Sequence, residues 1–121
     1  YDVEMCPWSP LAGGFLTGKY DRDEEMPEGT RGSESSQFAD RYFSEANFDA
    51  LDVLREVADE AEASPAQVSL AWLMHHPQVT APIVGARTVE QLEENLAADG
   101  IDLTDDQFQR LAEAKDAPTL V

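Results

Sequence analysis

Two short apolar segments, residues 3–8 and 79–84, constrain the fold of this chain more than any other feature. Both indicate β-strands, and each is followed by stretches in which apolar residues recur at helical spacing. The resulting order is strand, loop, helix, helix, strand, helix, helix, which is typical of parallel βα units. Parallel strands occur almost only inside larger sheets that helices cover on both faces. The order therefore predicts an α/β fold in which this chain forms the end of a barrel, with two parallel strands and about four helices.

Capping residues mark the expected helix starts. Ser64 and Gln67 stand three residues apart around a proline, which is the pattern of a capping box. A threonine and a glutamine repeat this spacing at residues 88–91 and 104–107. Apolar residues at helical spacing predict a further helix over residues 47–63.

Charge excludes several kinds of partner. The chain has 8 Lys and Arg against 25 Asp and Glu, a net charge of -17. Such a field repels nucleic acid and anionic membranes, and no apolar run reaches the roughly 20 residues of a membrane-spanning helix. The acids are scattered over predicted helical faces, which argues against a disordered acidic tail. Both an adaptation to concentrated salt and an ordinary acidic protein remain open as explanations.

Cysteine and histidine give little sign of a site. Cys6 is the single cysteine, so an internal disulfide and a cysteine-based zinc site are excluded. It is expected to be a small buried strand residue, and a reducing cytoplasm fits. His75 and His76 end a predicted helix, where a cationic imidazole favours the helix dipole. No acid, cysteine or third histidine stands at metal-binding spacing around them, so no metal site is expected.

Three blocks of sequence resemble the aldo-keto reductases over nearly the whole chain. Residues 8–20 (WSPLAGGFLTGKY) are similar to the loop after the seventh barrel strand of that family, and residues 64–73 (SPAQVSLAWL) to its seventh major helix. Residues 82–96 (PIVGARTVEQLEENL) are similar to the eighth strand and its helix. The resemblance implies a (β/α)8 TIM barrel, of which this chain is the C-terminal part with the last two βα units.

The third block suits a phosphate and a base. A glycine followed by a capped helix directs free N–H groups and the positive dipole end toward a ligand, and Arg87 can bond a phosphate in bidentate fashion. Gln91, Glu94 and Asn95 fall on one helix face, within reach of a single ligand. The resemblance implies that Arg87 contacts the 2′-phosphate of NADP(H) and that Gln91, Glu94 and Asn95 surround the adenine. Gly85 is also an expected cofactor-binding residue. The alternative is that Gln91 only caps the helix and the other two are solvated.

The first block suits a pyrophosphate and a nicotinamide ring. Its glycines allow the backbone to approach a pyrophosphate closely, and Ser9 and Lys19 supply donors. The resemblance implies that Trp8 stacks on the nicotinamide; the alternative is an ordinary core aromatic. Arg31 is a weak match to an arginine that relatives place against the cofactor phosphates. The expected cofactor-binding residues of this block are Trp8, Ser9, Leu11, Gly13 and Lys19.

The resemblance divides the chain into five segments of one barrel domain. They are a strand and cofactor loop (1–20), a mobile loop (21–46), helices (47–77), the last strand and cofactor helix (78–98) and a C-terminal helix (99–121). The proline- and glycine-containing polar stretch carries the loop assignment.

The resemblance also implies what is missing. The family's general-acid tyrosine and its lysine, aspartate and histidine partners belong to the earlier part of the barrel, so no catalytic residue is expected here. The chain is expected to be the cofactor-binding portion of a cytoplasmic oxidoreductase that reduces aldehydes or ketones with NADPH. Its expected partners are a small carbonyl or alcohol substrate and the remainder of the barrel. The alternatives are a nucleotide-binding regulatory subunit related to potassium-channel beta subunits, or an inactive truncated product.

Overall fold

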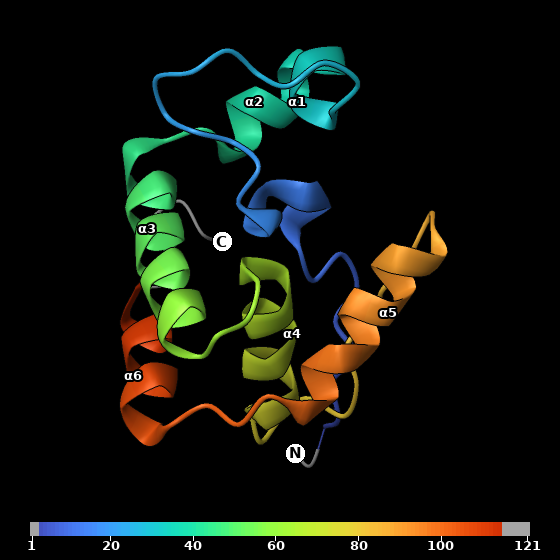
Figure 1. The fold of residues 1–121 in the computed structure, drawn as a ribbon, viewed down its shortest axis with the longest axis vertical. Coiled ribbons are helices and arrows are strands. Elements are labelled where there is room, and N and C mark those ends of the chain that lie inside the picture. The colour runs from blue at the N-terminus through green and yellow to red at the C-terminus, as the bar shows by residue number, and fades with distance from the viewer. Residues whose placement is uncertain (1–2, 115–121) are drawn as a thin grey trace.

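The computed structural model describes residues 3–114 of the chain, and helices dominate it (Figure 1). In the lower half of the view, α3 stands beside both α4 and α6, whereas α5 lies at the opposite side of α4. The elements in chain order are η1 (Ala12–Thr17), α1 (Arg31–Glu34), α2 (Ser36–Tyr42), α3 (Glu45–Glu60), α4 (Pro65–His75), α5 (Val89–Ala97), η2 (Ala98–Gly100) and α6 (Asp105–Ala114).

The two predicted strands lie side by side in parallel, but they do not form regular strands within residues 3–114. Only two isolated parallel bridges join them, Met5 to Val79 and Trp8 to Ile83. The Thr80 N–H donates to the Met5 carbonyl at 2.8 Å, and the Ile83 N–H donates to the Pro7 carbonyl at 2.8 Å. The expectation of two regular strands is therefore wrong for the described residues. Prolines within both segments remove ladder donors, and two adjacent parallel segments are too few to build a stable sheet.

Helix starts follow the capping signals closely. The Ser64 hydroxyl accepts from the Gln67 N–H at 3.2 Å, and the Gln67 side chain accepts from the Ser64 N–H at 3.0 Å. Thr104 and Gln107 exchange the same two bonds at the start of α6. The predicted helix over 47–63 is α3, displaced by two to three residues at each end. The expected end of the last helix lies outside the described residues.

The segment expected to be a loop over residues 21–46 contains two short helices. The side chain of Thr30 caps α1, and that of Ser35 caps α2. The Tyr20 hydroxyl accepts a hydrogen bond from the Gly32 N–H at 3.0 Å, and Phe38 is buried. A cap at each start and a buried aromatic anchor give this polar segment the order that its composition did not indicate.

An aromatic cluster forms the centre of the core. Phe15 of η1 is 1% exposed and its ring lies 6.4 Å from that of Tyr20 and 5.4 Å from that of Phe48. The cluster fixes η1 against the start of α3. The buried members are Phe15, Tyr20, Phe38 and Phe48, with Tyr42 and Phe43 packed beside them.

Three arginines neutralise the acidic face of α3. Arg22 contacts Glu45, Asp49 and Asp52, and Arg110 of α6 contacts Glu56 and Glu60. Arg55 pairs with Asp52 on its own helix and with Asp21. The excess of acid is therefore partly compensated at α3.

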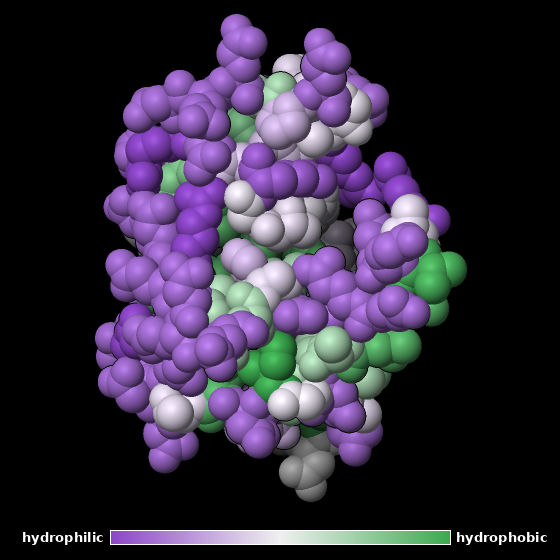
Figure 2. Space-filling model, in the orientation of Figure 1, coloured by the Kyte–Doolittle hydropathy of each residue, from purple (hydrophilic) through white to green (hydrophobic). Residues whose placement is uncertain are grey.

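Apolar side chains remain exposed along α5 and the bridged segments. Figure 2 shows hydrophobic residues at the surface over α5, on the right of the view. Cys6 is exposed as well, so the expectation of a buried strand residue is wrong for this structure. The two bridged segments form a single narrow layer, which leaves their side chains exposed. The large exposed apolar residues are Val3, Met5, Trp8, Ile83, Val84, Val89, Leu92 and Leu96.

Candidate cofactor site

A tight turn over residues 9–14, which includes the start of η1, forms the first half of the candidate site. Gly13 and Gly14 adopt φ values of 66° and 105°, in the left-handed region that favours glycine. The Gly14 N–H donates to the Leu11 carbonyl at 3.0 Å, and the Ala12 N–H donates to the Ser9 carbonyl at 3.0 Å. The turn thus places two half-buried residues without side chains, Gly13 and Gly14, next to each other.

Two cations lie against this turn. A Cβ atom placed on Gly13 would come within 3.2 Å of Arg31 Nη1, and one on Gly14 within 2.9 Å of Lys19 Nζ. Within residues 3–114, neither cation has a carboxylate within salt-bridge distance, in contrast to Arg22, Arg55 and Arg110. The turn is therefore a local positive site on a strongly acidic chain, which suits an anionic group.

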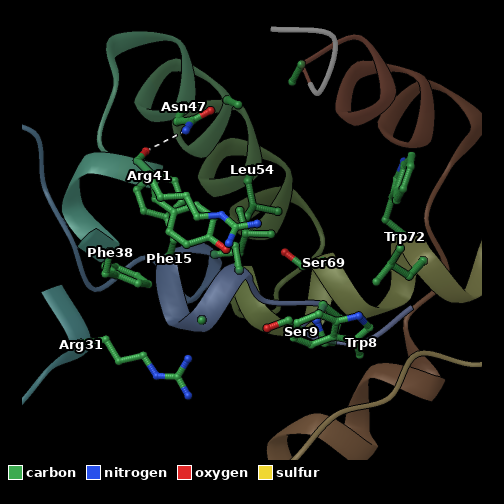
Figure 3. Close-up of a pocket in the computed structure, with 18 of the residues that line it drawn as sticks. Trp8, Ser9, Phe15, Arg31, Phe38, Arg41, Asn47, Leu54, Ser69 and Trp72 are labelled. Carbon is green, nitrogen blue, oxygen red and sulfur yellow. Dashed lines mark hydrogen bonds between the residues drawn. The ribbon is translucent and has the colours of Figure 1, made fainter. Parts of the chain in front are cut away.

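A cavity of about 760 Å³ lies beside the turn, and Figure 3 shows side chains that line it. Trp8 and Ser9 border it on one side, and Arg31 and Arg41 reach toward it from α1 and α2. Trp8 is 79% exposed, so it lies outside the core that the described residues form, and its ring is open at the rim of the cavity. A flat aromatic ring and several donors thus border the same cavity, as a nucleotide cofactor requires.

The third sequence block lies at the start of α5 and does not line this cavity. The Thr88 hydroxyl accepts from the Gln91 N–H at 3.1 Å, as the capping pattern predicts. The Gln91 side chain accepts from the Arg87 N–H at 2.8 Å, one residue before the position of a regular capping box. Gln91 therefore has a capping role, and its side-chain NH₂ group is not needed for that bond.

Glu94 links α5 to α4. Its carboxylate accepts from the Ser64 hydroxyl at 2.6 Å, and its carbonyl accepts from the Gln67 side chain at 3.2 Å. Asn95, one residue further along α5, is half-buried. The start of α4 is thus hydrogen-bonded to the face of α5 that was predicted to contact adenine.

Gly85 and Arg87 are both exposed. Gly85 has a φ outside the left-handed region, and a Cβ placed there would meet nothing within 4 Å. Packing within this chain therefore does not require a glycine at this position. The roles predicted for these two residues toward a ligand stay predictions.

Comparison with known proteins identifies the family. A family model described as "Aldo/keto reductase family" matches residues 1–116. The chain belongs to the aldo/keto reductase family.

Curated members of the family with related sequences span considerably more residues. L-glyceraldehyde 3-phosphate reductase of Escherichia coli O157:H7 is 40% identical over 100 residues, 79% of this chain and 28% of the relative. Aldo-keto reductase yakc [NADP(+)] of Schizosaccharomyces pombe is 32% identical over 115 residues, 95% of this chain and 34% of the relative. A putative voltage-gated potassium channel subunit beta of Schizosaccharomyces pombe is 38% identical over 102 residues, 81% of this chain and 29% of the relative. The chain thus spans about a third of the length of each of these relatives.

Membership implies a (β/α)8 barrel, and the parallel bridges between residues 5–8 and 79–83 agree with neighbouring βα units of such a barrel. Within residues 3–114, no three His, Cys, Asp or Glu side chains come together as a metal site. His75 Nδ1 instead lies 2.7 Å from the Ala71 carbonyl. No described helix combines the length and apolar character that crossing a membrane requires.

Sequence reasoning missed two arginines of this region, Arg41 of α2, which lines the cavity, and Arg55 of α3. Arg55 of α3 donates hydrogen bonds to the carbonyls of Gly18 and Tyr20, at the end of the turn segment. In the sequence, Asp52 and Arg55 have the spacing of an ordinary surface ion pair on a helix, so no pattern distinguishes this arginine. Only the packing of η1 against α3 reveals the contact.

Proposed function

We propose that this chain is the cofactor-binding C-terminal portion of an NADPH-dependent oxidoreductase that reduces aldehydes or ketones. The observation that carries the proposal is the Gly13–Gly14 turn, with Lys19 and Arg31 against its backbone and Trp8 at the rim of the adjoining cavity. The three-fold greater length of the relatives supports the view that the remainder of a barrel completes the protein.

The residues of the turn fit a pyrophosphate. A side chain at residue 13 or 14 would place a Cβ atom next to a cation. The close approach of an anion to the backbone therefore requires glycine at both positions. Ser9 borders the same cavity, and the Leu11 carbonyl holds the turn's shape. In this proposal Trp8 stacks on the nicotinamide ring, and the bound cofactor supplies the hydride that reduces the carbonyl substrate.

The adenosine end is assigned to α5. Helix dipole and guanidinium coincide at Arg87, where they suit the 2′-phosphate, and Gly85 leaves room for close approach. The NH₂ group of Gln91, with the side chains of Glu94 and Asn95, would contact the adenine. The Glu94 carboxylate keeps one oxygen outside its bond to Ser64, so a structural and a binding role are compatible.

Replacement of Arg87 by alanine tests the proposal in the complete polypeptide that contains this chain. The variant keeps the backbone bond to Gln91 and removes only the exposed guanidinium. Because a charge-assisted hydrogen bond contributes about 1.5–3 kcal/mol, NADPH affinity should fall roughly 10- to 150-fold while NADH affinity stays nearly constant. Titrations that follow quenching of protein fluorescence measure both constants.

Arg110→Ala is the matched control, because it removes an arginine engaged with α3 acids and leaves the proposed site intact. Equal loss of NADPH and NADH affinity in Arg87→Ala would mean that Arg87 maintains the shape of the loop. No loss of either would remove the 2′-phosphate assignment.

A regulatory subunit is the second candidate function. The observation that favours it is the 38% identity to the putative potassium channel subunit beta. Both functions use a bound nucleotide, so turnover separates them. An enzyme oxidises NADPH in the presence of an aldehyde panel, whereas a regulatory subunit binds NADPH with little or no turnover, and an inactive truncated product does neither.

A further inference from the structure

Arg55 of α3 bonds the backbone on both sides of Lys19. Its Nη2 atom donates to the Gly18 carbonyl at 2.9 Å and to the Tyr20 carbonyl at 2.8 Å. The same nitrogen lies 2.9 Å from Asp21 Oδ1. The two N–H groups of this nitrogen are thus shared among acceptors at residues 18, 20 and 21, which tie the backbone around Lys19 to helix α3.

The guanidinium is itself held in place. Its Nη1 atom donates to Asp52 Oδ1 at 3.3 Å, and Arg22 bonds the other oxygen of that carboxylate at 2.9 Å. A Cβ atom on Gly18 would come within 3.7 Å of Arg55 Nε, so backbone and guanidinium are in close contact. The side chain is only 30% exposed. Restriction by a shared carboxylate and by packing makes this arginine a fixed point rather than a mobile surface cation.

The ammonium group of Lys19 depends on this backbone. Its side chain extends back along the turn, so that Nζ lies against Gly14 and 5.5 Å from the centre of the Tyr20 ring. Within the described residues it has no carboxylate partner that could orient it. The two bonded carbonyls restrict the backbone dihedral angles of residues 18–20, and these angles set the direction in which the Lys19 side chain leaves the backbone.

We propose that Arg55 is a positioning residue for the anion site, which directs Lys19 toward the Gly13–Gly14 turn by holding the carbonyls on either side of it. The inference rests on the proposed function, in which Lys19 contacts the cofactor pyrophosphate. It assigns a function at the site to a residue of α3 that does not itself reach the phosphates. The energetic effect of Arg55 on cofactor binding should therefore pass through Lys19.

A double-mutant cycle measures this dependence. NADPH dissociation constants are determined in the complete polypeptide for the unmodified protein, Lys19→Met, Arg55→Gln and the double variant. Lys19→Met should weaken binding roughly 10- to 150-fold, the range of one charge-assisted contact. Arg55→Gln should weaken it about 5- to 10-fold when Lys19 is present and less than about 2-fold in the Lys19→Met background, because contacting residues are non-additive.

Two further variants separate positioning from general stability. Arg110→Gln also removes an arginine from the acids of α3 but makes no contact with the turn, so NADPH binding should be unchanged. Arg55→Lys keeps the charge but cannot reproduce the planar fork, and should show an intermediate dissociation constant. If Arg55→Gln does not fold, Arg55→Lys replaces it in the double-mutant cycle. In that case Arg55→Lys must lower affinity with Lys19 present and not in its absence.

The outcomes distinguish the inference from the proposed function. Equal fold losses for Arg55→Gln in both backgrounds overturn the positioning role while leaving the cofactor site intact. Full affinity in folded Arg55→Lys or Arg55→Gln has the same meaning. If the unmodified protein does not bind NADPH, or if Lys19→Met binds it normally, the proposed role of the turn fails, and the inference fails with it.

Discussion

Gly13→Ala should destabilise the protein through two separable effects. The first is the backbone, because alanine at φ 66° lies in the left-handed region, where an L-residue costs roughly 1–2 kcal/mol. The second is overlap, because the new Cβ atom would lie 2.9 Å from Phe38 Cε2 and 3.2 Å from Arg31 Nη1. Arg31 is exposed and can move aside. Phe38 is buried among other aromatic rings and cannot move as freely.

The overlap with a buried ring should cost about 1–3 kcal/mol, as overpacking of a core does. Together with the backbone effect, the expected loss is roughly 2–5 kcal/mol of unfolding free energy. This is a large fraction of the roughly 5–15 kcal/mol that typically separates folded and unfolded states. The magnitude depends on the ring at residue 38, so Gly13→Ala combined with Phe38→Leu should cost less than the sum of the two single variants.

Urea unfolding of the complete polypeptide, followed by circular dichroism, measures the loss. Gly29→Ala is the matched control, because Gly29 has a φ of 73° and a Cβ there would meet nothing within 4 Å. It should show the backbone effect alone, roughly 1–2 kcal/mol. If Gly13→Ala and Gly29→Ala cost the same, the close packing of Phe38 and Arg31 against the turn is refuted.

Three further outcomes are expected. The hydrogen bond from Arg22 holds the pKa of Asp52 below its ordinary value, so this carboxylate stabilises the fold above about pH 4, and the contribution is lost as pH falls through the lowered pKa. Unfolding free energies of Asp52→Asn should therefore fall less steeply with acid than those of the unmodified protein, and identical pH profiles would contradict the pairing. If the net charge of -17 is an adaptation to salt, molar KCl should raise the urea midpoint; an unchanged or lower midpoint leaves an ordinary acidic protein. Residues 1–121 alone should be unstable or oligomeric, because parallel segments without neighbours leave apolar side chains such as Met5 and Ile83 exposed; a monomer with a cooperative melt would count against the barrel-portion proposal.

Local signals predicted most of the helices. The capping bonds between Ser64 and Gln67, and between Thr104 and Gln107, join residues three positions apart. A local sequence pattern is therefore enough to predict them. The helix over residues 47–63 followed equally from its apolar spacing. The predicted order of the two strand segments and their parallel contact also held at the two bridges. These features depend on interactions close along the chain or on alternation that only one fold class explains.

Predictions from the sequence failed where contacts between residues far apart in the chain determine the local structure. Residues 21–46 looked like a loop because their composition is polar, yet Phe38 and the Tyr20 hydroxyl, which bonds Gly32, order two helices there. Regular strands did not form, since a parallel ladder needs neighbours that the described residues do not supply. Cys6 lies exposed for the same reason.

The amino-acid sequence by itself indicated the family, through three blocks that resemble it, and predicted the starts of α4, α5 and α6. The helix starts could be predicted because capping acts over a few residues. The set of residues suited to a nucleotide stays a prediction. Tertiary structure alone brought Arg31 against Gly13 and placed Arg55 across the carbonyls that flank Lys19. Those contacts join residues 18 to 37 positions apart, and no local pattern encodes a partner at such separation. The physical reason is the packing of the aromatic cluster, which brings η1, α2 and α3 together and thereby decides which cations reach the turn.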